Sequence, residues 1–124
     1  AFVLALHRLC VRRAGLLCLL LAAADVLYDL CFEVEGITGL LVQVDVVLVL
    51  GSKHVVNPAA RTPGSAIFCM PIIEAYKAKT VIVNKRSMAA GYAGLDNELF
   101  YMDKTMMVFG DAKKVIEDMG KAIE

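Results

Sequence analysis

Val44–Leu50 reads VDVVLVL and is followed directly by Gly51. Six of these seven residues are apolar and four are valine, whose branched side chain favours an extended strand over a helix. An unbroken apolar run of this length is typical of a strand that is buried on both faces of a parallel sheet. Glycine then ends the strand, because it takes turn conformations at no steric cost. The stretch is the clearest predicted strand of the chain and indicates an α/β fold.

Four further apolar runs flank this stretch and predict the remaining strands. Thr80–Asn84 reads TVIVN, and Met106–Phe109 is ended by Gly110 in the same way. Phe2–Leu6 and Cys31–Val34 are shorter runs nearer the amino terminus, and we expect a strand at each of them.

Helix-compatible segments lie between these runs. Leu16–Ala24 is rich in Leu and Ala, which favour helices. A last helix is predicted from Asp111 toward Ile123, with the aspartate as its N-cap. All three prolines fall within Asn57–Pro71, which we therefore expect to be a long connection between strands.

Alternating strands and helices, with glycine at the strand ends, indicate a parallel sheet. Sheets of this kind bind ligands beyond the carboxyl ends of their strands. The segments that begin at Gly51, Asn84 and Gly110 should therefore converge on one crevice.

Composition sets the broad class. A chain of 124 residues has room for one domain with one core. Lys and Arg balance Asp and Glu at 13 each, so net charge gives no indication of nucleic-acid binding. The hydrophobic share of 59% fits a sheet buried on both faces, or a surface that meets other domains.

The cysteines predict no metal site and no disulfide framework. Cys10, Cys18, Cys31 and Cys69 form no CxxC pair, and no His stands at metal-ligand spacing from them. We expect reduced, mostly buried thiols.

Ala14–Ala24 (AGLLCLLLAAA) follows two arginines and superficially resembles a secretory signal. A membrane-spanning helix needs roughly 20 apolar residues, so this stretch is too short for one. We expect a buried helix and no membrane span, with a small secreted or membrane-associated protein as an open alternative.

Asn84 is followed by Lys85, Arg86 and Ser87 at the end of a predicted strand. A guanidinium fork, a point charge and a hydroxyl together suit a phosphomonoester. In a dinucleotide fold this position reads a 2′-phosphate and so selects NADP over NAD. The alternative is an ordinary solvated charge pair.

Two glycine-containing segments add to this edge. Gly91-Tyr92-Ala93-Gly94 can fold tightly and bring the tyrosine ring over a ligand, or it is a plain turn with a packed ring. Gly110-Asp111-Ala112-Lys113 lies at a strand-to-helix junction, where backbone N–H groups suit an anion, or it is a simple helix cap.

The segment after the first strong strand, Gly51–Ala60, reads GSKHVVNPAA. Asn57-Pro58 favours a turn, while Lys53 and His54 face either the crevice or solvent.

The order and spacing of these motifs resemble a known family. VDVVLVLG, VVNPAA, Met70-Pro71, KRSM, GYAG, DNELFY and FGDAKK follow one another within Val44–Lys114 as in the NADP(H)-binding domain of proton-translocating NAD(P) transhydrogenase, domain III of the beta subunit. A weaker match continues through Ala22–Asp29 (AAADVLYD). The resemblance implies a single domain over 1–124, divergent over 1–43 and strongly family-like over 44–124. The fold it implies is a Rossmann-like, doubly wound parallel sheet that lacks its first strand and glycine loop.

The resemblance also implies a cofactor site. Lys85, Arg86 and Ser87 would hold the 2′-phosphate of NADP(H), and Gly91–Gly94 would form a lid. The expected cofactor-binding residues are Gly51, Asn57, Lys85, Arg86, Ser87, Gly91, Tyr92, Ala93, Gly94, Gly110, Asp111, Ala112 and Lys113. Gly110, Asp111 and Lys113 would lie around the adenosine, and Asn57 with its neighbours nearer the nicotinamide.

In the family, hydride passes directly between NAD(H) on a partner domain and NADP(H) on this one, without a catalytic side chain. The implied partners are an NAD(H)-binding domain and a transmembrane domain that carries protons, within a dimeric complex. Its location would be the cytoplasmic face of a bacterial inner membrane or the matrix face of the mitochondrial one. The isolated chain is expected to be an inactive component of this oxidoreductase.

Three departures from the family pattern keep an alternative open. The glycine fingerprint after the first strand is absent, and the family's Gly-Ala-Asn-Asp reads Gly51-Ser52-Lys53-His54 here. Cys69 stands where the family usually has Gly. The alternative is a non-catalytic divergent fragment with weak or no dinucleotide binding.

Overall fold

A computed structural model describes residues 3–6, 14–51, 54–87 and 95–123. The strands are β1 (Leu4–Leu6), β2 (Cys31–Glu33), β3 (Val46–Leu50), β4 (Thr80–Lys85) and β5 (Thr105–Phe109), and the α-helices are α1 (Ala14–Ala23), α2 (Val34–Thr38) and α3 (Ala112–Ile123). Short 3₁₀ turns are η1 (Tyr28–Leu30), η2 (Leu41–Gln43), η3 (Pro58–Arg61), η4 (Ala75–Lys77) and η5 (Glu98–Tyr101). All five predicted strands and both predicted helices are present, with bounds that shift by one or two residues.

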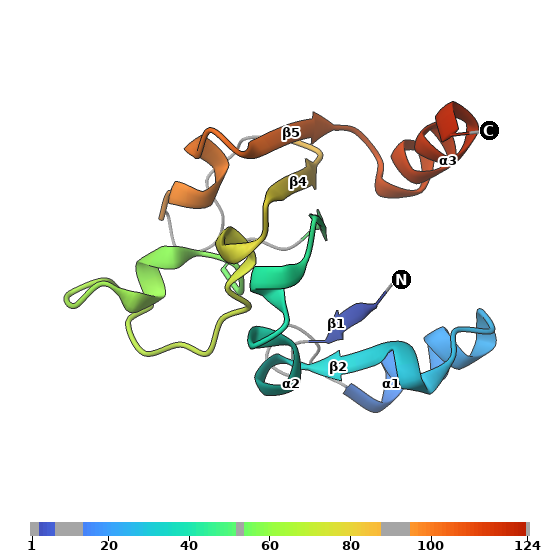
Figure 1. Cartoon of the computed structure of the whole chain (residues 1–124), viewed down its shortest axis with the longest axis horizontal. Coiled ribbons are helices and arrows are strands. Elements are labelled where there is room, and N and C mark those ends of the chain that lie inside the picture. The colour runs from blue at the N-terminus through green and yellow to red at the C-terminus, as the bar shows by residue number, and fades with distance from the viewer. Residues whose placement is uncertain (1–2, 7–13, 52–53, 88–94, 124) are drawn as a thin grey trace.

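The strands form two separate parallel sheets. One contains β1 and β2, and the other has the order β3-β4-β5 (Figure 1). Val47 lies opposite Val81 and Val81 opposite Thr105, so the three strands begin and end nearly level. Parallel sheets with intervening helices confirm the predicted Rossmann-like α/β fold class.

One face of the three-stranded sheet carries the core. Val81 and Val83 are fully buried on this face, and Leu41 of η2 and Leu99 of η5 belong to the same buried cluster. Long connections with 3₁₀ turns provide many of the core residues. The sequence of these connections has no helical periodicity, so it does not predict which of their residues are buried. The core lies directly beneath the strands that lead to the carboxyl edge.

The opposite face of the same sheet is open. Val46, Leu48 and Leu50 point to the other side from Val47 and Val49, and each is exposed. Met106 of β5 shares this face and is 52% exposed. The helix α3 contributes no buried residue and extends beyond the end of β5 (Figure 1). This sheet is therefore buried on one side only, contrary to the expectation from its apolar strands.

The cysteines are less buried than the sequence predicts. Cys31 is half-buried, Cys69 is exposed, and both are free thiols. Cys10 and the Cys18 side chain lie outside the part of the chain that is described. Cys69 also has a φ of 65°, in the left-handed region that favours glycine. The glycine that the resemblance implies at this position would adopt this conformation without strain.

Within the described ranges, no helix is long and apolar enough to cross a membrane. The helix α1, which holds the signal-like stretch, is ten residues long. The same residues hold no group of three or more His, Cys, Asp or Glu side chains that could bind a metal ion.

Candidate nucleotide site at the carboxyl edge

Backbone hydrogen bonds hold the carboxyl ends of the three long strands together. The Gly51 N–H donates to the Asn84 carbonyl at 3.4 Å, and the Gly110 N–H donates to the Lys85 carbonyl at 3.0 Å. The ladder thus continues past the last residues of β3 and β5 into the turns that follow. The three segments that the sequence analysis singled out therefore share one edge, as the parallel topology requires.

Asn84 fixes the geometry of this edge from within the sheet. Its side chain is buried, and its amide nitrogen donates to the carbonyls of Val108 and Gly110, each at 3.3 Å. These bonds join the end of β4 to the strand-to-helix turn of β5. The sequence analysis assigned Asn84 no role of its own. The available signal was a polar residue ending an otherwise apolar strand, where a buried amide must find partners.

The glycines at the edge have conformations suited to tight turns. Gly51 has a φ of 66°, and a Cβ there would meet no atom within 4 Å. Gly110 has a φ of 156°, and its Cβ would lie 3.1 Å from the Val115 side chain. Gly51 is thus required by backbone conformation, and Gly110 by conformation together with the close approach of α3.

The two cations at the end of β4, Lys85 and Arg86, differ in their surroundings. The Lys85 ammonium lies 4.8 Å from the centroid of the Phe100 ring, close enough for a cation–π contact. Lys85 is half-buried on the core side of the sheet, whereas Arg86 and Ser87 are exposed. The structure therefore presents Arg86 and Ser87 to solvent at the end of β4 and rests Lys85 against an aromatic ring.

Asp111 caps α3 through its own side chain. One of its carboxylate oxygens accepts from the N–H groups of Lys113 at 3.1 Å and Lys114 at 3.3 Å. The Lys113 ammonium lies 3.9 Å from the Glu117 carboxylate, one turn further along the exposed helix. Ala112 is half-buried beside them. This geometry matches the simple helix cap that the sequence analysis left open as an alternative.

Asn57 lies in the interior of the described chain. It is fully buried, its amide nitrogen donates to the Asp96 carbonyl at 3.0 Å, and its amide oxygen accepts from the Ala59 N–H at 3.0 Å. It thereby caps η3 and ties this turn to the segment before η5. Its two amide atoms are already engaged, so the structure gives Asn57 a structural role at this position.

The remaining predicted residues fall into two groups. The predicted lid, Gly91, Tyr92, Ala93 and Gly94, lies outside the described residues, as do Ser52 and Lys53. His54 is described and is half-buried, and its Nδ1 atom is buried without a hydrogen-bond partner in the described part of the chain.

An electrostatic cluster occupies the end of the connection between β3 and β4. Glu74 is buried and pairs with Lys77 and, at 3.2 Å, with Arg61, and it accepts from the Tyr76 hydroxyl at 2.9 Å. The hydrogen bond from Lys77 lowers the pKa of the Glu74 carboxyl, against the opposing effect of burial. Burial, followed by the bond to Glu74, raises the pKa of Tyr76. These partners satisfy the carboxylate, so the cluster stabilises the connection and offers no open ligand position.

Parallel strands with glycine turns, and a cation-bearing loop at their carboxyl edge, place this chain in the class of Rossmann-like α/β domains. Comparison with known proteins narrows the class. The family model for the NAD(P) transhydrogenase beta subunit matches residues 2–122. Two relatives from Rhodospirillum rubrum, both described as NAD(P) transhydrogenase subunit beta, are each 49% identical over 120 residues.

The match covers 96% of this chain and 26% of each relative. The chain belongs to the NAD(P) transhydrogenase beta subunit family. It spans about a quarter of the length of the curated relatives that it matches.

Proposed function

We propose that this chain binds NADP(H) as part of a proton-translocating NAD(P) transhydrogenase. The observation that carries the proposal is the hydrogen-bonded carboxyl edge, where β4 ends in Lys85, Arg86 and Ser87 between the turns at Gly51 and Gly110. Exposed Arg86 and Ser87 fit the donor set that a phosphomonoester needs, and the edge lies where α/β sheets bind their ligands.

The chain's own task in this proposal is to bind and orient. Arg86 and Ser87 hold the 2′-phosphate, and Lys85 joins them when its ammonium leaves the face of Phe100. A bound NADP(H) would supply the nicotinamide chemistry: NADPH would donate a hydride to NAD+ on a partner domain, or NADP+ would accept one from NADH there. No side chain needs to act as nucleophile or base, because the reaction depends on bringing two nicotinamide rings into contact.

The same proposal specifies the complex in which the chain would act. The partners are an NAD(H)-binding domain and a transmembrane domain, in a dimeric complex at the cytoplasmic face of a bacterial inner membrane or the matrix face of the mitochondrial one. The exposed apolar side chains of the sheet and of α1 favour such contacts, because large apolar patches commonly mark interfaces.

A calorimetric titration tests the cofactor. We expect saturable binding of NADPH and at least tenfold weaker binding of NADH under the same conditions, because only NADPH carries the 2′-phosphate. The double variant Lys85→Ala/Arg86→Ala should weaken NADPH binding by about tenfold to a hundredfold and remove the preference.

The matched control is Lys79→Ala/Lys121→Ala, which removes the same charge from two exposed lysines outside the carboxyl edge. Its NADPH affinity should equal that of the wild type. Equal loss of affinity in both double variants would mean that net charge, and not the β4 end, governs binding.

A second candidate is the non-catalytic fragment with weak or no dinucleotide binding. The inward-facing amide of Asn57 and the contact of Lys85 with Phe100 favour it, because two expected cofactor residues are already engaged. Absence of NADPH binding by a chain with native dispersion in its NMR spectrum would establish this candidate. Hydride transfer to nicotinamide analogues, after mixing with an NAD(H)-binding domain, would dismiss it.

A further inference from the structure

Lys85 ends β4 on the face of the sheet that carries the core. Side chains alternate between the two faces along a strand, so Lys85 shares its face with the fully buried Val81 and Val83. Arg86 and Ser87 follow the strand and are exposed. A phosphate group that Arg86 and Ser87 bind would therefore lie away from the surface on which the Lys85 side chain rests.

An aromatic ring lies against the end of the Lys85 side chain. The Lys85 ammonium is 4.8 Å from the centroid of the Phe100 ring, which belongs to the core cluster and is 7% exposed. The negative face of an aromatic ring attracts a cation, and the attraction is stronger where water is partly excluded. Because Lys85 is half-buried, this contact holds its ammonium on the core side of the sheet.

Hydrogen bonds fix η5, the turn that carries this ring. The Asn97 side chain accepts from the Leu99 N–H at 3.0 Å, and the Phe100 N–H donates to the Asn97 carbonyl at 3.0 Å. The buried Asn57 joins the start of the turn to η3 through a hydrogen bond to the Asp96 carbonyl at 3.0 Å. The position of the ring is therefore determined by the core and not by the lysine.

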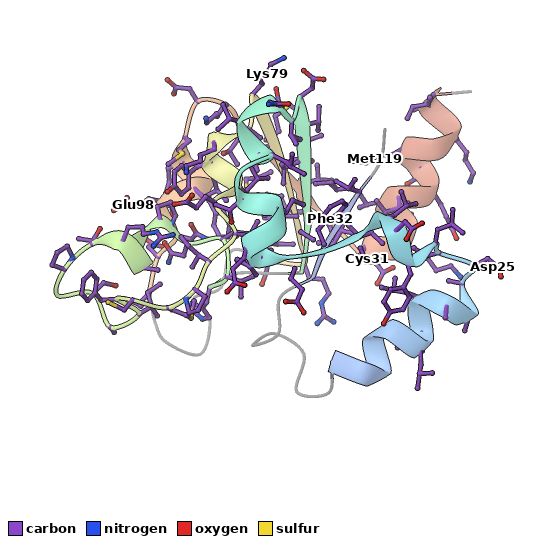
Figure 2. The ribbon with its side chains drawn as sticks, turned by 60° about the horizontal axis from the view of Figure 1, so that its bottom comes forward. Asp25, Cys31, Phe32, Lys79, Glu98 and Met119 are labelled. Carbon is purple, nitrogen blue, oxygen red and sulfur yellow. The ribbon has the colours of Figure 1, made fainter. Side chains whose placement is uncertain are left out.

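Lys85 is the partner that can move. Its ammonium ends a flexible four-carbon stem, whereas the ring is packed in the core. Figure 2 shows Glu98, the first residue of η5, on the side of the molecule where η3 lies, so the turn is packed against a neighbour. Movement of the ammonium toward Arg86 and Ser87 thus breaks its contact with Phe100.

We propose that Phe100 is a specificity-determining residue of the candidate nucleotide site, because its ring competes with the 2′-phosphate of NADP(H) for the Lys85 ammonium. The inference rests on the proposed function and deepens it. NADP(H) draws the ammonium away from the ring, whereas NAD(H) has no 2′-phosphate and leaves the contact in place. Lys85 therefore raises the preference for NADP(H), and Phe100 limits it by the strength of the contact that has to break.

Calorimetric titration of Phe100→Leu tests the competition, because this variant removes the ring and keeps an apolar side chain. We expect its NADPH affinity to rise by at least about threefold and its NADH affinity to stay unchanged. In a Lys85→Met background the same change at Phe100 should leave NADPH affinity unaltered, since no charge remains to be released. An unchanged or lower NADPH affinity of Phe100→Leu, or an equal gain in both backgrounds, would overturn the proposal.

Leu99→Val is the matched control for loosening of the turn. It removes one methylene from a fully buried neighbour of Phe100 and leaves the ring in place. Its NADPH affinity should equal that of the wild type. A gain as large as that of Phe100→Leu would mean that a looser turn, and not release of the lysine, improves binding.

Proton NMR of the wild type reads the contact directly, and it gives a result even if Phe100→Leu fails to fold. The ring current of Phe100 should shift the ε-methylene protons of Lys85 upfield, and the Lys85→Met spectrum assigns their signal. Saturating NADPH should remove the shift, and saturating NADH should not.

The outcomes separate this inference from the proposed function. A wild type that prefers NADPH but keeps the upfield shift when saturated would overturn the role of Phe100 alone. A wild type that binds neither nucleotide, or both equally well, would overturn the proposed function and this inference with it.

Discussion

Two regions of this molecule use apolar residues in opposite ways. The carboxyl-terminal region, residues 44–123, buries Val81, Val83 and Leu99 completely beneath a three-stranded sheet. The amino-terminal region, residues 3–43, buries only Ile37 and Leu41 among its described side chains. Its α1 carries Leu19 and Leu20 at 69% and 59% exposure. Both regions have apolar sequences, but the core lies mainly in the first and includes Leu41 from the second.

The difference shows what composition alone cannot distinguish. A high apolar content predicts burial, but it does not say whether the burying surface lies within the chain or on a neighbour. In residues 44–123 the 3₁₀ turns η4 and η5 close over the sheet, with fully buried Ala75 and Leu99 in place. In residues 3–43, the Leu19 and Leu20 side chains of α1 stay largely exposed. We therefore expect the stability of the isolated chain to reside in the carboxyl-terminal region.

The largest expected effect separates the two regions directly. Leu99→Ala should cost about 2–5 kcal/mol of unfolding free energy, because it leaves a cavity in the closed core. Leu20→Ala removes the same atoms from a side chain that is 59% exposed, and should stay within about 0.5 kcal/mol of the wild type. Urea denaturation followed by circular dichroism measures both. Similar losses of unfolding free energy in the two variants would show that α1 is packed in solution and that the two regions do not differ.

A smaller effect is expected at Asp25 and Cys69, the two described residues other than glycine that have a positive φ. One lies in each region. Cys69→Gly should raise the unfolding free energy by about 1 kcal/mol, because it relieves the left-handed conformation at φ 65°. Cys69→Ala keeps the Cβ and should give no gain. Asp25, at φ 55° beside α1, tolerates this conformation better, so Asp25→Gly should change stability little. Thermal unfolding of the three variants gives the answer, and a gain from Cys69→Ala would rule out the conformational explanation.

The smallest effect concerns pH and sharpens the comparison. The pKa of Glu74 is lowered in the folded chain, first by the hydrogen bond from Lys77, so its carboxylate stabilises the fold above its ordinary pKa of 4.5. This contribution is lost as pH falls below 4.5 and through the folded pKa. Glu74→Gln should therefore be less stable than the wild type near pH 7, and the difference should shrink below pH 4.5. A difference that is independent of pH, in urea titrations from pH 3 to 7, would show that packing and not charge is responsible.

The sequence predicted the strands well because their signal is local. Continuous apolar runs ended by Gly51 and Gly110 identify β3 and β5 without any knowledge of their neighbours. The helix α2 was missed, because Val34–Thr38 is only five residues long and contains Gly36. The open face of the sheet could not be predicted, because it depends on which elements pack against the strands.

The shared carboxyl edge was predictable in position, whereas the direction of its side chains was less so. Strand ends in a parallel sheet converge by topology, so the shared edge followed from the sequence. The contact of Lys85 with Phe100 joins residues from different elements, and no local pattern marks it. The capping role of Asn57 did have a signal, because asparagine commonly caps turns through its side chain. Asn57 and Asn97 are both buried, and the side chain of each accepts from the N–H two residues later and so caps a 3₁₀ turn.

The hydrogen bond from Asn57 to the Asp96 carbonyl has a consequence for protein engineering. The chain that leaves β4 at Lys85 is fixed there by the Gly110 N–H, and at Asp96 it is fixed again by Asn57. The two ends of this connection are therefore each held by a neighbouring element. Doubling a connection costs only about 0.6 kcal/mol of closure entropy. A fluorescent reporter or affinity tag inserted between the two anchor points should therefore leave the sheet folded.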